Sequence, residues 1–143
     1  MKIIERFFPH PKPDAAAIQR MFPTRPRYEA LKPHELPDPK VQLHRFIEEF
    51  HYHSPAFGQV TIPVGFTTDF ASIPGLVKWW LDDDDSRILC PSLVHDRRYD
   101  EKTGTRLSAD IELMFNMIVC GARPTMAFAV FLSVRIGGGS HWK

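Results

Sequence analysis

Apolar and polar residues alternate along two short stretches in the first half of the chain. Residues 41–47 and 59–64 each place apolar side chains at about every second position, which is typical of strands with one buried face. Pro63 is expected at a sheet edge or a strand end, because proline has no amide hydrogen to donate to a neighbouring strand. Residues 51–58, between the two stretches, are expected to form a turn region. The pattern predicts a small antiparallel sheet.

From residue 73 onward the apolar residues recur at helical spacing instead. Four helices are expected, at residues 74–81, 86–99, 109–120 and 125–136, with Ser86 and Ser108 as N-caps of the second and third. Gly121 is expected to end the third helix, because glycine readily adopts the left-handed conformation found there. Strands followed by helices predict an α+β fold, in which a small antiparallel sheet precedes a compact cluster of three to four helices.

Prolines set the first 40 residues apart from the rest, since eight of the 13 prolines lie there. Proline fixes φ and removes a backbone donor, so regular sheet and long helix are not expected in this segment. A short helix over residues 14–22, capped by Asp14, is the exception. The segment also carries Phe7, Phe8, Phe22 and Tyr28, so we predict an extended arm lying on apolar surface of its own domain or of a partner. The predicted organisation is an arm over residues 1–40 and a single α+β domain over residues 41–143.

Composition narrows the class of protein. The chain has 143 residues and a net charge of +1, and this near-neutral charge argues against nucleic acid as the main partner. No run approaches the roughly 20 apolar residues that a transmembrane helix needs. The N-terminus shows no apolar signal-peptide core, so synthesis in the cytoplasm is expected, unless another device exports the protein. Cys90 and Cys120 are therefore expected to be reduced thiols packed in helices.

His95 and Asp110 are the strongest candidates for chemistry. His95 and Tyr99 are four residues apart and share one face of a largely apolar helix. Asp110 lies in the first turn of the next predicted helix, where the helix dipole favours a carboxylate, and antiparallel packing of the two helices would bring its carboxylate to His95. A carboxylate on one ring nitrogen fixes the tautomer and makes the other nitrogen a competent base. His95, Asp110 and Tyr99 are thus predicted as catalytic residues.

Asp69 and Asp96 are candidates for a metal site. Asp69 follows an apolar strand, Asp96 adjoins His95, and their oxygens could together hold a divalent cation. The alternative for Asp69 is a helix cap. The alternative for the whole cluster is a buried polar network that locks two helices together, with counter-ions drawn from Arg97, Arg98 and Arg106. Spacing alone leaves both readings open.

The ordered motifs resemble a known family. Phe66-x-Thr68-Asp69-Phe70-Ala71-Ser72-Ile73-Pro74, His95-Asp96-x-x-Tyr99, Ala109-Asp110, Val134-Arg135-x-Gly137 and Trp142 are similar to the domain-of-unknown-function 1353 family of tailed phages and prophages. The resemblance covers roughly residue 42 to the C-terminus and leaves out the arm. It implies a phage or prophage origin and brings no established activity.

A fainter, local similarity is to secreted phospholipases A2, which also place His-Asp-x-x-Tyr on a helix. This similarity implies His95 as the base that activates water, Asp96 as a calcium ligand and Asp110 as the residue that orients the base. The chain departs from that pattern, because it has no glycine-rich calcium loop, no disulfide framework and a much shorter spacing to Asp110. The likeness is one of local geometry and not of kinship.

Two functional hypotheses follow. In the first, the chain is a phage hydrolase, metal-assisted through Asp69 and Asp96, that acts on a component of the host envelope. In the second, it is a non-catalytic virion, tail or assembly protein whose arm docks on a neighbouring subunit, and the polar cluster is architectural.

Overall fold

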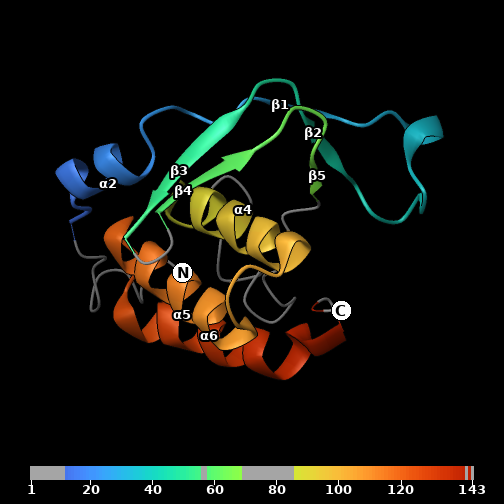
Figure 1. Ribbon diagram of the computed structural model, residues 1–143. Coiled ribbons are helices and arrows are strands. Elements are labelled where there is room, and N and C mark those ends of the chain that lie inside the picture. The colour runs from blue at the N-terminus through green and yellow to red at the C-terminus, as the bar shows by residue number, and fades with distance from the viewer. Residues whose placement is uncertain (1–11, 56–57, 69–85, 141, 143) are drawn as a thin grey trace, which may run out of the picture.

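The computed structural model describes residues 12–55, 58–68, 86–140 and 142 (Figure 1). The strands are β1 (Tyr28–Ala30), β2 (His44–Phe46), β3 (Phe50–Ser54), β4 (Gly58–Ile62) and β5 (Thr67–Thr68). The helices are α2 (Ala15–Met21), α4 (Ser86–Glu101), α5 (Arg106–Val119) and α6 (Pro124–Gly137), with 3₁₀ turns η1 (Pro33–Glu35) and η2 (Gly138–Ser140). This arrangement confirms the predicted α+β class. The helix predicted at residues 74–81 lies outside the described residues.

The strands form two small antiparallel sheets rather than the single sheet expected. One sheet has the order β1-β2-β5, and the other is the β3-β4 hairpin. The prediction of a turn over residues 51–58 was wrong, because Phe50–Ser54 is a strand that pairs with Gly58–Ile62. Phe50 and Tyr52 are buried and alternate with the more exposed His51 and His53. The two polar histidines obscured an alternation that the sequence did contain.

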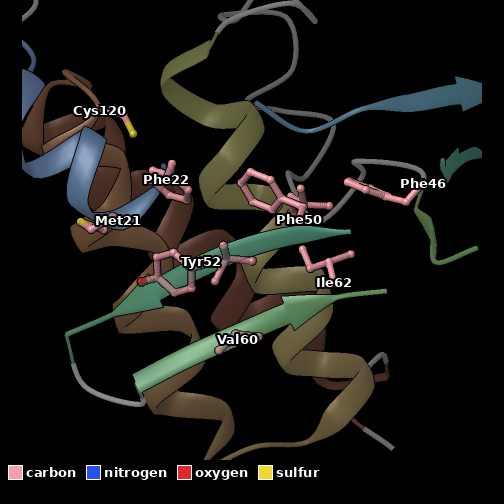
Figure 2. Close-up of a cluster of buried hydrophobic side chains, with 10 residues drawn as sticks. Met21, Phe22, Phe46, Phe50, Tyr52, Val60, Ile62 and Cys120 are labelled. Atoms are coloured by element: carbon pink, nitrogen blue, oxygen red, sulfur yellow. The ribbon is translucent and has the colours of Figure 1, made fainter. Parts of the chain in front are cut away.

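The β3-β4 hairpin packs its apolar face against α4 and α2 (Figure 2). The cluster of buried side chains there comprises Met21, Phe22, Phe46, Phe50, Tyr52, Val60, Ile62, Leu93, Val94 and Cys120. Phe22 stacks on Tyr52 with ring centroids 5.2 Å apart. Burial of such large side chains contributes roughly 1.5–3 kcal/mol each, so this cluster fastens the hairpin to the helices. Cys90 and Cys120 are free thiols, as predicted.

The described part of the N-terminal arm packs on its own chain. Asp14 caps α2 as predicted, with its side chain accepting from the amide of Ala17 at 3.0 Å. Met21 and Phe22 are buried at the end of α2. Tyr28–Ala30 forms strand β1 on the edge of β2, although no strand was expected in the arm. The flanking prolines, Pro26 and Pro33, leave a proline-free interval long enough for this short strand.

The three long helices form a layer in which α5 contacts both α4 and α6 (Figure 1). Helix α5 begins three residues earlier than predicted, with Thr105 as its N-cap and Ser108 completing a reciprocal capping box. The chain leaves α5 through Gly121, whose φ of 97° is the left-handed conformation expected there. Among the described residues, none of the helices has the length and apolar character needed to cross a membrane.

Candidate functional site

The carboxylate of Asp110 is the centre of a buried polar cluster between α4, α5 and α6. Because α5 begins at Arg106, Asp110 lies in the second turn and not at the helix end. The helix dipole stabilises charges mainly within the first turn, so it does little to stabilise the carboxylate of Asp110. Asp110 is fully buried, so neighbouring side chains must compensate for the hydration that its carboxylate has lost. Three of them do.

His95 is the first of these partners. Its Nε2–H donates to Oδ1 of Asp110 at 2.7 Å, and its side chain is 1% exposed. The bond joins the middle of α4 to α5, two helices that pack against each other and are connected by the turn that contains Gly104. On the other side of the ring, Nδ1 is buried and meets no hydrogen-bond partner among the described residues. The structure thus brings together the two residues that the sequence singled out.

Tyr99, one turn after His95, is the second partner. Its hydroxyl donates to Oδ1 of Asp110 at 2.6 Å, and its ring lies against that of His95 with centroids 4.2 Å apart. Burial and the hydrogen bond to Asp110 raise the pKa of Tyr99 to about 12. Tyr99 is therefore a neutral donor over the physiological range. Its geometry is that of a buttress for the carboxylate.

Arg135 of α6 is the third partner, and the residue-by-residue reasoning missed it. Its Nη1 donates to Oδ2 of Asp110 at 2.8 Å. Burial raises the pKa of Asp110, but the hydrogen bonds from His95, Tyr99 and Arg135 outweigh that effect and lower the pKa below its ordinary value. Asp110 is therefore an anion at neutral pH. The Val134-Arg135-x-Gly137 motif was the one sequence signal that pointed to Arg135.

The arginines expected as counter-ions act elsewhere. Arg97 pairs with Asp100 and Glu101 on its own helix. Arg106 donates through Nη2 to the carbonyls of Val134 and Arg135 at 2.8 and 2.6 Å, which caps the end of α6. The Nε of Arg106 also donates to the hydroxyl of Tyr99 at 3.3 Å. Arg106 thus acts on the carboxylate only through Tyr99 and the backbone of α6.

A close approach of the C-terminal chain explains part of the glycine run after α6. A Cβ on Gly138 would lie 3.0 Å from the Tyr99 hydroxyl oxygen, which is tighter than ordinary contacts. The ring of Trp142 then meets Tyr99 edge-on, with centroids 5.1 Å apart. Glycine at position 138 lets the C-terminal segment cover the Tyr99 side of the cluster.

Asp96 lies outside the Asp110 cluster. It is partly buried, and one carboxylate oxygen accepts from the hydroxyl of Thr68 at 2.5 Å. This bond ties the end of β5 to α4. Asp69, the other predicted metal ligand, lies outside the described residues. Within the described part of the chain, no three His, Cys, Asp or Glu side chains are grouped in a way that could hold a metal ion.

A second buried carboxylate, that of Glu112, lies two residues further along α5. Arg98 of α4 donates two hydrogen bonds to this carboxylate, from Nε to Oε1 at 2.9 Å and from Nη2 to Oε2 at 3.4 Å. The hydroxyl of Ser54 on β3 donates to Oε2 at 2.6 Å. Arg98 is 1% exposed. The sequence reasoning did not anticipate this ion pair, which joins the hairpin to both helices.

Comparison with known families places the chain. The model of a family described as protein of unknown function, DUF1353, matches residues 44–134. The chain belongs to this family. In this DUF1353 chain the match includes His95, Tyr99 and Asp110, whereas Arg135 stands one residue beyond it. A search of the curated proteins and a search of the solved structures found no match.

Proposed function

We propose that this chain is an accessory hydrolase of phage or prophage origin in which His95 is the general base and Asp110 orients it. The observation that carries the proposal is the buried ring of His95, bonded through Nε2 and without a described partner at Nδ1. Buried polar atoms in folded proteins are nearly always hydrogen-bonded. An unpaired ring nitrogen beside an oriented carboxylate is therefore best explained by a water or substrate group bound there during the reaction.

The chemistry follows from the tautomer. Asp110 is ionised and accepts from Nε2–H, so the lone pair of the neutral ring lies on Nδ1. Nδ1 takes a proton from a water molecule as that water attacks an acyl or phosphoryl centre, and the imidazolium returns the proton to the leaving group. Asp110 stabilises the imidazolium that forms. Tyr99 and Arg135 fix the carboxylate so that it needs no reorganisation during the step.

The proposal extends to a divalent cation near Asp96 and to a substrate in the host envelope. The carboxylate oxygens of Asp96 and Asp69 would be the ligands of this cation. The cation is tested by melting the protein with magnesium, calcium, manganese or zinc. We expect one of these ions to raise Tm in the wild type and not in Asp96→Asn. If none of the four raises Tm at millimolar concentration, the cation is removed from the proposal.

The activity is tested on a panel of purified peptidoglycan, phospholipid vesicles, and chromogenic esters and phosphodiesters. His95→Gln is expected to lower kcat by about 100- to 10,000-fold on whichever substrate the wild type cleaves. His53→Gln is the matched control, since His53 is an exposed histidine on β3, and it should keep the wild-type rate. Full activity in His95→Gln would exclude His95 as the base.

The second candidate is a non-catalytic virion, tail or assembly protein. The observation that favours it is that both buried carboxylates of α5 are paired with arginines, which an architectural role also explains. Because α2 and β1 pack on the chain itself, the docking segment of the arm would be residues 1–11, which include Phe7 and Phe8. Deleting residues 1–11 should then remove the protein from purified virions. If the truncated protein is incorporated normally, this candidate loses its docking element.

A further inference from the structure

Two polar atoms on helix α4 are buried without a hydrogen-bond partner in the part of the chain that the structure describes. One is Nδ1 of His95, and the other is the hydroxyl oxygen of Ser92. Ser92 is 1% exposed and His95 is 2% exposed, so bulk water reaches neither atom. A buried polar group without a partner is destabilising. Two of them on one helix therefore call for a ligand that both can bind.

The two residues lie on the side of α4 that faces α5. Ser92, His95 and Tyr99 are spaced by three and then four residues, which places them along one side of a helix. His95 and Tyr99 both donate to Asp110 of α5, and Figure 1 shows the two helices side by side. Ser92 therefore lies one turn before His95 in the same row of side chains.

The hydroxyl of Ser92 does not make the bond that a helical serine ordinarily makes. Such a hydroxyl commonly donates to the carbonyl four residues earlier in its own helix. Ser133 of α6 does so, because its hydroxyl donates to the carbonyl of Ala129 at 2.8 Å. Within the described ranges Ser92 makes no equivalent bond. Its hydroxyl hydrogen is therefore available to a group outside the helix.

Pro91 interrupts α4 in the same turn. Proline has no amide hydrogen, so α4 lacks one backbone hydrogen bond immediately before Ser92. Interruptions of this kind are where water inserts into the hydrogen-bond ladder of a helix. The turn that holds Ser92 thus has a local irregularity that accommodates an internal water.

The spacing of the two residues suits one bridging water. Cβ atoms of residues three apart on a helix are about 5–6 Å apart, and two successive hydrogen bonds through a water molecule span about 5 Å. A nucleophilic serine would instead bond directly to its base, and Ser92 and Nδ1 of His95 share no such bond. A hydroxyl donates one hydrogen and Nδ1 accepts one, so a single water satisfies both atoms.

We propose that Ser92 and His95 hold one water molecule between them, and that this is the water consumed by the hydrolysis proposed above, on which its catalytic part rests. The Ser92 hydroxyl donates to the water oxygen, and the water donates to Nδ1 of His95. The remaining lone pair of the water forms the bond to the acyl or phosphoryl centre as the proton passes to Nδ1. The bond to the leaving group then breaks, and the imidazolium protonates that group.

Crystal structures of the wild type, Ser92→Ala and Ser133→Ala test the water without any assay of activity. We expect an ordered water within about 3.2 Å of both Ser92 Oγ and His95 Nδ1 in the wild type. It should be absent from Ser92→Ala and present in Ser133→Ala, whose lost hydroxyl bonds its own helix. An empty wild-type site would overturn the proposal. A direct bond between Ser92 and Nδ1, or a water that persists in Ser92→Ala, would overturn it too.

Kinetics test what the water does, on whichever substrate the wild type cleaves. Ser92→Ala should lower kcat by about 10- to 100-fold and change KM by less than about twofold, because a misplaced water slows the chemical step alone. Ser92→Thr keeps the hydroxyl and should recover most of kcat, and Ser133→Ala should keep the wild-type rate. Undiminished kcat in Ser92→Ala, or covalent labelling of Ser92 by a fluorophosphonate, would overturn the assignment of Ser92 as the residue that positions the water.

Circular dichroism melting checks that the variants fold. Ser92→Ala adds no volume to its buried position and is expected to fold. If Ser92→Thr does not accommodate its extra methyl group, Ser92→Ala and Ser133→Ala decide the outcome. A wild type that cleaves nothing in the substrate panel but holds the water would remove the hydrolase and leave the water site standing. An active wild type with an empty site would do the reverse.

Discussion

Asp110 and Glu112 lie two residues apart on α5, and both carboxylates are buried beside an arginine, yet their surroundings differ. Glu112 receives all of its described bonds from the side chains of Arg98 and Ser54. Asp110 accepts a hydrogen bond at Oδ1 from His95, whose second ring nitrogen has no described partner. Two carboxylates on one helix are therefore equipped for different tasks. The Glu112 pair joins sheet to helices, and the Asp110 pair holds a base.

The largest effect is expected from breaking the Glu112 pair. Arg98→Met leaves the carboxylate buried without its cation, so the free energy of unfolding should fall by about 3–5 kcal/mol. Urea denaturation measures this loss. The double variant Arg98→Met/Glu112→Leu should recover most of it, because it removes both charges. A loss below about 1 kcal/mol in the single variant would contradict the architectural role.

Asp110→Asn should have a smaller effect on stability and a larger one on activity. The amide keeps the shape of the side chain but removes the negative charge to which Arg135 and His95 donate. The free energy of unfolding should therefore fall by about 2–3 kcal/mol. The folded fraction should also lose hydrolase activity by about 100-fold or more, because His95 is no longer held in its working tautomer. Arg98→Met, assayed per folded molecule, should keep its activity. Equal activity losses in the two variants would erase the distinction between the centres.

The stability difference between wild type and Asp110→Asn should also depend on pH. The folded pKa of Asp110 lies below its ordinary value of 3.8. Its stabilising contribution is therefore fully present above that value and is lost as the pH falls through the lower, folded pKa. The urea midpoints of the two proteins should be well separated at about pH 5 and should converge as the pH falls below about 4. A separation that stays constant down to the most acid pH would contradict the assigned ionisation.

The smallest effect is expected from Tyr99→Phe. Removing one hydroxyl donor from Asp110 should cost about 0.5–1.5 kcal/mol, and Arg135 and His95 would keep the carboxylate in place. The hydrolase rate should fall by less than in Asp110→Asn, as befits a buttress. A rate loss as large as that of His95→Gln would instead give Tyr99 a direct part in the chemistry.

The central residues of the site could be predicted from the sequence, but the residues around them could not. His95, Tyr99 and Asp110 could be grouped because spacing within a helix and the short connection to the next helix constrain their positions. Arg135 and Glu112 could not, since their pairing depends on how α6 and the hairpin pack on α5, and local pattern does not encode this. That strands precede the long helices was likewise predictable from periodicity. The β3 strand was missed because histidines occupy its outward positions.

The most direct test of the central claim is the tautomer of His95. Long-range ¹H–¹⁵N NMR correlations of the imidazole ring distinguish the nitrogen that carries the proton from the one that carries the lone pair. We expect the neutral ring of the wild type to hold its proton on Nε2, bonded to Asp110, with the lone pair on Nδ1, and we expect Asp110→Asn to lose that preference. A wild-type ring with its proton on Nδ1 would contradict the assignment of His95 as an Asp110-oriented base.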